Sequence, residues 1–211
     1  MMTAAVRKVA LTTHITSSVG WLGAVAAFLA LAIAGVTSSD PQIVRAAYLG
    51  MYLTTWYVIV PLCVASFLTG LVDSLGTSWG LFRHYWVVTK LLLTVLATII
   101  LFVHTQPIDR VAGIAAQIDL ASSDLRQIRL QLVGDAAAAL FVLFGTTTLS
   151  VYKPWGLTPY GLRKQAEVLP EGHPAALRRS RPAGQYVIAA IIGFVLLILA
   201  LHLFGIGVHG H

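Results

Sequence analysis

Five long apolar stretches constrain this chain more than any other feature of its sequence. They cover approximately residues 9–36, 46–72, 86–104, 130–152 and 186–208. Each is long enough to cross about 30 Å of hydrocarbon as an α-helix, which satisfies its backbone hydrogen bonds internally. With 57% apolar and 10% charged residues, the chain also lacks the composition of a soluble domain. We therefore expect an all-α membrane protein, a single bundle of five transmembrane helices in a lipid bilayer.

The basic residues outside these stretches predict the orientation, because Lys and Arg accumulate on the cytoplasmic side. A cytoplasmic N-terminus places nine of them inside, namely Arg7, Lys8, Arg83, Lys153, Arg163, Lys164, Arg178, Arg179 and Arg181. Four then lie outside, namely Arg45, Arg110, Arg126 and Arg129. We expect a multi-pass plasma-membrane protein whose C-terminus is extracytoplasmic. The basic cytoplasmic loop at 153–185 is interpreted as a contact with anionic lipid, not with nucleic acid.

The segment 107–121 has apolar residues at the spacing of an amphipathic helix, with polar residues between them. The apolar positions are Ile108, Val111, Ile114 and Ile118. We expect this helix to lie on the outer surface like a lid. Cys63 is the only cysteine, so a disulfide or a multi-cysteine metal site within one chain is excluded.

Lys90 lies inside the third apolar stretch, where an ionisable side chain costs at least a few kcal/mol and needs a partner. One interpretation is structural: Lys90 pairs with Asp73 or extends its amine to the interface. The other is that Lys90 is a catalytic residue that meets an anionic substrate or cofactor. It begins a polar stripe at helical spacing, Lys90, Thr94, Thr98, Leu101, His104 and Thr105.

Two other stretches carry polar faces of the same kind. The second has Tyr52, Thr55, Trp56, Cys63, Ser66, Gly70 and Asp73 on one face, and the first has His14, Ser17, Ser18 and Trp21 near one end. Residues that share a helix face contact the same surroundings. These faces are therefore expected to meet in the interior of the bundle.

Four histidines lie in two depth layers, His14 and His84 on the inner side, His104 and His202 on the outer side. Imidazole is an axial ligand of b-type haem, and basic residues can neutralise the propionates. The layering fits one haem held from His14, or two haems. Each histidine can equally form a structural hydrogen bond. A separate hypothesis places copper(II) or zinc at His104, Asp135 and His202, because imidazole and carboxylate together suit those ions.

The segments HITSSVGWLGAVAAF, with His14, and RHYWVVTKLLLTVLATIILFVH, with Lys90, resemble helices of a superfamily of small membrane proteins. It includes the HemJ-type protoporphyrinogen oxidases and the CopD-type copper-resistance proteins. In the HemJ type, a first-helix histidine and a lysine opening a later leucine-rich helix are the key residues, and b-type haem is bound. The resemblance implies these roles for His14 and Lys90. The fifth span, the outer amphipathic helix and the additional outer histidines depart from the HemJ pattern and indicate a separate branch.

Three functions follow as expectations. The first is a b-type haem protein with a redox or electron-transfer role, a membrane oxidoreductase whose partner is a quinone or another electron carrier. The second is a CopD-like protein that binds or transports copper or another metal ion, with the stripe from Lys90 to Thr105 as its path. The third is a non-catalytic membrane scaffold. The sequence leaves the oligomeric state open.

The asymmetry of basic residues generates a test of topology. A reporter fused after His211 should behave as extracytoplasmic, and one inserted near Glu171 as cytoplasmic. Protease accessibility and reporter activity in intact cells measure this. The reverse pattern would invert the two layers of histidines.

Overall fold

The computed structural model describes residues 2–76, 80–117, 123–153, 156–167 and 186, without the side chains of residues 104, 116, 117 and 123–125. Within that part of the chain, four helical segments are long and apolar enough to cross a membrane. They are α1 (Ala4–Thr37), the continuous run of α2 (Pro41–Thr54), η1 (Thr55–Ile59) and α3 (Val60–Gly76), then α4 (Tyr85–Gln117) and α5 (Ser123–Tyr152). The expected fifth span at 186–208 lies outside the described residues beyond its first position.

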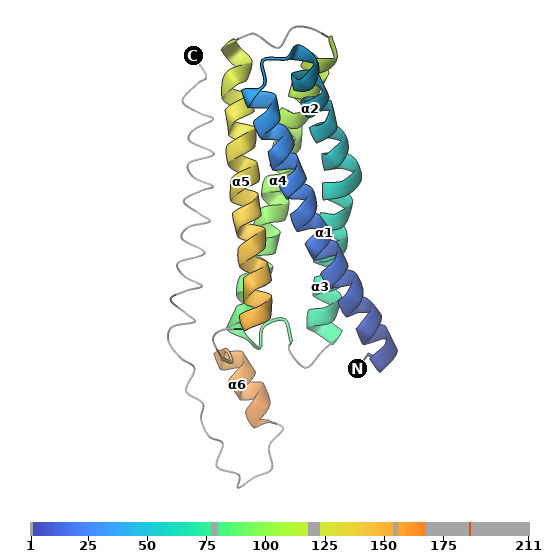
Figure 1. Cartoon of the computed structure of the whole chain (residues 1–211). Coiled ribbons are helices and arrows are strands. Elements are labelled where there is room, and N and C mark those ends of the chain that lie inside the picture. The colour runs from blue at the N-terminus through green and yellow to red at the C-terminus, as the bar shows by residue number, and fades with distance from the viewer. Residues whose placement is uncertain (1, 77–79, 118–122, 154–155, 168–185, 187–211) are drawn as a thin grey trace.

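The four segments run up and down beside one another (Figure 1). α1 packs against α2, α3 and α5, and α4 packs against α5, α2 and α3. We call the end where α1 and α4 begin the N-terminal end and the opposite one the far end. The short helix α6 (Pro159–Ala166) lies beyond the N-terminal end (Figure 1). An up-and-down order with short connections is the usual arrangement of a helical bundle. The all-α fold is thus confirmed for the described residues, with four helical segments long and apolar enough to cross a membrane.

Helix starts follow from local sequence. Thr3 and Asp40 precede α1 and α2, and each side chain accepts a hydrogen bond from a backbone N–H of the first turn. Pro41 then takes the first helical position, where its missing N–H costs nothing. Such caps satisfy amides that have no partner inside the helix.

The second span contains one turn of π-helix, η1, immediately before Pro61. Pro61 has no N–H to donate four residues back, so the helix cannot keep its regular ladder there. Instead the N–H of Val60 donates to the carbonyl of Thr55, five residues back. The extra residue in this turn brings Thr55 and Ile59 into the protein interior, where they are 0% and 3% exposed. Such turns occur frequently at functional sites.

The segment expected to form a separate outer helix is part of α4. Over its described residues the helix continues through Pro107 to Gln117. Ile108, Val111 and Ala115 belong to the buried core, and Val111 is only 1% exposed. Because the apolar side of this segment packs against the bundle, the helix α4 continues beyond Pro107. A lid on the outer surface is therefore not what these residues form.

Arg129 on α5 joins three helices at the far end. Its Nε–H donates to the hydroxyl oxygen of Tyr48 on α2 at 2.7 Å, and its Nη2 donates to the backbone carbonyl of Gly35 on α1. The guanidinium also lies 5.4 Å from the centroid of the Tyr48 ring. A Cβ atom on Gly35 would come within 2.8 Å of the Tyr48 ring, so only glycine permits this approach.

This junction predicts a large difference between two neighbouring arginines. Arg129→Met should lower the free energy of unfolding by roughly 2–4 kcal/mol, because it removes two hydrogen bonds from a charged group. Arg126→Met should change it little, because Arg126 is exposed. Thermal unfolding of the purified proteins in detergent measures both. Equal effects of the two substitutions would show that the Arg129 contacts do not stabilise the bundle.

Candidate functional site

A cavity of about 660 Å³ lies at the N-terminal end, between α1, α3, α4 and α5. We call it the polar cavity. Its charged or titratable wall residues are Arg7, His14, Asp73, Lys90 and Lys153. Hydroxyl side chains also line it, namely Ser18, Ser66, Ser74, Thr94, Thr146, Thr147 and Ser150. Three cations face one carboxylate, so the cavity favours an anionic group.

His14 on α1 is held by α3. Its Nδ1 lies 3.0 Å from the backbone carbonyl oxygen of Ser66 and 3.3 Å from the hydroxyl of Thr69. A carbonyl oxygen only accepts, so Nδ1 carries the proton and donates it to Ser66. Nε2 of the neutral ring is then the nitrogen with the free lone pair. The hydrogen bond to the backbone thus fixes both the tautomer and the orientation of the ring.

Lys90 on α4 reaches that second nitrogen. Its Nζ lies 3.0 Å from Nε2 of His14, and an ammonium can only donate, so His14 accepts. Asp73 on α3 lines the same cavity. Of the two interpretations of Lys90, pairing with Asp73 and contact with a bound anion, neither anticipated this partner. The signal was present, because His14 and Lys90 lie at similar depths on polar faces.

Small residues at the contact of α1 with α3 make room for the ring of His14. A Cβ atom on Gly70 would lie 2.8 Å from Cε1 of His14. One turn away, the hydroxyls of Ser18 and Ser66 are 2.7 Å apart and join the same two helices. The polar face of the second stretch therefore positions His14, as expected from the helical spacing.

Among the other expected haem ligands, only His84 has a described side chain, and it does not reach this cavity. His84 lies in the connection before α4, where it forms an isolated β-bridge with Leu157, and it is absent from the cavity wall. Its ring centroid is 6.4 Å from that of Trp86. His202 and the side chain of His104 lie outside the described part of the chain. Across the residues that are described, no three His, Cys, Asp or Glu side chains gather as a metal site.

Residues of the polar stripe of α4 line different cavities. Lys90 and Thr94 line the polar cavity, whereas Leu101 lines a different one. The hydroxyl of Thr98 donates to the carbonyl of Thr94 and lies 3.4 Å from Sγ of Cys63, and that of Thr105 donates to Phe102. These threonines satisfy their hydroxyls within their own helix.

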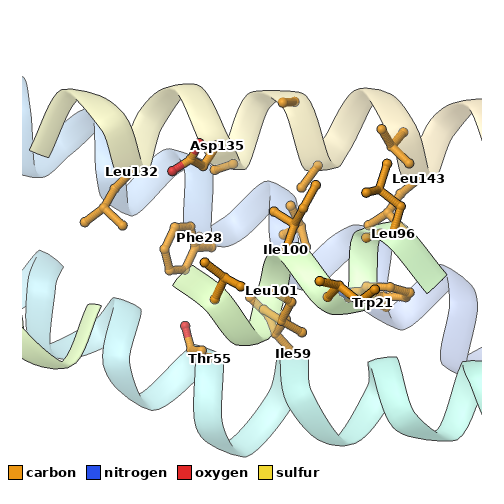
Figure 2. Close-up of a pocket in the computed structure, with 18 of the residues that line it drawn as sticks. Trp21, Phe28, Thr55, Ile59, Leu96, Ile100, Leu101, Leu132, Asp135 and Leu143 are labelled. Carbon is orange, nitrogen blue, oxygen red and sulfur yellow. The ribbon is translucent and has the colours of Figure 1, made fainter. Parts of the chain in front are cut away.

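A second cavity, of about 180 Å³, lies deeper in the bundle between α1, η1, α4 and α5 (Figure 2). We call it the apolar cavity, because all but two of its wall residues are apolar; the exceptions are Thr55 and Asp135. Asp135, expected as a metal ligand, thus lies in apolar surroundings and not beside His14. Trp21 and Leu143 line both cavities, so the two adjoin each other.

Comparison with known protein families, with curated proteins and with solved structures found no match for this chain. The site is therefore interpreted from its own geometry.

Two glycine substitutions should have opposite effects on stability. Gly70→Ala should destabilise the protein, because the added methyl group displaces the ring of His14 and lengthens its bond to Ser66. Gly134→Ala on α5 should be neutral or stabilising by up to about 1 kcal/mol, because alanine favours the helix and no described residue of another helix comes within 4 Å of the new methyl group. Thermal unfolding of the two purified variants in detergent measures both effects. Equal stability of Gly70→Ala and wild type would show that the ring is not tightly confined.

Proposed function

We propose that this chain is a membrane protein that binds one b-type haem through His14 and has a redox or electron-transfer role. One observation carries the proposal: His14 lines the polar cavity, and its Nδ1 is committed to the backbone carbonyl of Ser66, which leaves the lone pair on Nε2. Histidines that ligate metals commonly donate their other ring N–H to a backbone carbonyl or a carboxylate, which raises the basicity of the ligating nitrogen.

The walls of the polar cavity support a haem. Its volume of about 660 Å³ falls within the range of roughly 300–1,000 Å³ that is typical of small-molecule and cofactor sites. Arg7, Lys90 and Lys153 supply positive charge for two propionates, and apolar side chains such as Phe67 and Trp86 supply contacts for the porphyrin faces. When bound, the haem supplies one-electron chemistry.

The chain's own residues have distinct roles in this proposal. His14 provides the axial nitrogen, and Ser66 orients it. An N–H of Lys90 and a metal ion cannot both use the lone pair on Nε2 of His14. When a metal ion is bound there, the Lys90 ammonium must donate to another acceptor. A propionate or an anionic substrate is the acceptor that the charge of the cavity favours. Lys90 thus holds a proton and a positive charge beside the cofactor.

The resemblance to the HemJ type implied roles for His14 and Lys90, and the proposal gives a role to the same two residues. With the proposed cytoplasmic N-terminus, the polar cavity lies in the cytoplasmic half of the plasma membrane. Of the copper or zinc site expected at His104, Asp135 and His202, only Asp135 has a described side chain, and it lines the apolar cavity.

A visible spectrum tests the proposal directly. Purified wild-type protein should show a haem Soret band, and His14→Ala should lose it while the chain still inserts into the membrane, because the iron loses its ligand. The matched control is His84→Ala, which should keep the band because His84 does not line the polar cavity. Wild-type protein without haem after expression with adequate haem supply would refute the proposal. A normal spectrum of His14→Ala would refute the assignment of the ligand.

A further inference from the structure

The apolar cavity has the size and walls to hold a ring. Its volume is about 180 Å³, and the walls are formed by residues such as Phe28, Ile59 and Leu132 (Figure 2). For comparison, an apolar cavity of roughly 150 Å³ stays dry and binds benzene. The π-helical turn η1 contributes Thr55 and Ile59 to this wall. A ligand of this cavity therefore has an apolar ring-sized group.

One side of the cavity reaches the outer surface of the four described spans, between α4 and α5. Ile99 and Val103 on α4 line the cavity, yet each is 49% exposed. Ala138 on α5 lines it and is exposed as well. In a membrane-spanning bundle this surface faces the hydrocarbon. A ligand can therefore come from the bilayer and leave an apolar chain there, which favours a lipid-soluble molecule.

The two polar wall residues specify hydrogen-bond donors on the ligand. Thr55 and Asp135 lie on different sides of the cavity, one on η1 and one on α5 (Figure 2). The Thr55 hydroxyl already donates to the carbonyl of Met51 at 2.8 Å, so toward the cavity it can only accept. Asp135 takes part in an interaction within the protein, but an ionised carboxylate accepts several hydrogen bonds. A ring with one O–H at each end satisfies both acceptors.

We propose that the apolar cavity binds the hydroquinone ring of a prenylated quinol from the bilayer. The two ring hydroxyls donate to Thr55 and Asp135, and the prenyl chain leaves between α4 and α5. The redox role of such a site rests on the proposed function. The quinol site adds to that function the chemical class of the electron carrier. Because Trp21 and Leu143 line both cavities, such a ring lies next to the cavity proposed for the haem.

Binding to the purified full-length protein tests the site. A short-chain quinol, decylbenzoquinol, is titrated anaerobically by calorimetry in detergent. Ala139→Phe places a ring into the cavity wall and should raise the Kd at least about tenfold, or roughly 1.4 kcal/mol. The matched control is Ala137→Phe on the same helix, which is exposed and lines neither cavity. It should leave the Kd within about twofold.

The donors are tested separately. Thr55→Val keeps the side-chain shape and should weaken binding of the quinol roughly three- to tenfold, because one hydrogen bond is lost. The dimethyl ether of the same ring has no donors, so it should bind wild type more weakly and be insensitive to Thr55→Val. Equal binding of the ether, or of a plain alkyl chain, would overturn the quinol assignment. An unchanged Kd in Ala139→Phe would also overturn it.

Haem content measured on the same samples separates this inference from the proposed function. Haem-free wild type that binds the quinol with the expected dependence on Ala139 supports the quinol site and refutes the haem proposal. Haem-containing wild type that binds no quinol refutes the quinol site alone.

Discussion

The contact between the Lys90 ammonium and Nε2 of His14 is the interaction on which the N-terminal end of the bundle depends. A lysine inside a membrane-spanning helix requires polar partners, since an isolated charge in hydrocarbon is costly. α1 packs mainly against α2, α3 and α5, so this contact reaches across the polar cavity to α4. Ser66 then holds the opposite side of the imidazole. Three helices are thereby connected through one ring, and the cavity around it remains open for a ligand.

The far end is organised by a different cation. Arg129 donates to Tyr48 and to Gly35, so its charge is taken up by groups of the protein itself. Between the two ends lies the buried core, with Phe28, Met51 and Leu143 among its members. A cation that donates to fixed groups of the protein stabilises the fold, whereas a cation that donates to a titratable ring in a cavity wall can exchange that partner for a ligand.

The sequence predicted the helical spans that the structure describes, and it predicted that His14 and Lys90 lie at one depth. Both follow from length and period alone. It did not predict that the two touch, because periodicity gives the face and depth of a residue but not the order of the helices. The continuous α4 was missed because an amphipathic pattern suits a surface helix and a core helix equally. Asp109 is exposed, as a polar position of the pattern suggests, and it also accepts a hydrogen bond from the indole N–H of Trp56 at 3.0 Å. The π-turn depends on Pro61 together with its packing.

The two cavities relate to the two parts of the proposed chemistry through their polarity. A cofactor with ionised propionates needs cations and water nearby, and the polar cavity has three cations at the bundle end. A lipid-soluble carrier needs an apolar wall open to hydrocarbon, and the apolar cavity has that wall at greater depth. Trp21 lines both cavities. In the proposed arrangement, the charged cofactor and the uncharged ring would therefore lie in adjoining cavities with this indole in the wall of each.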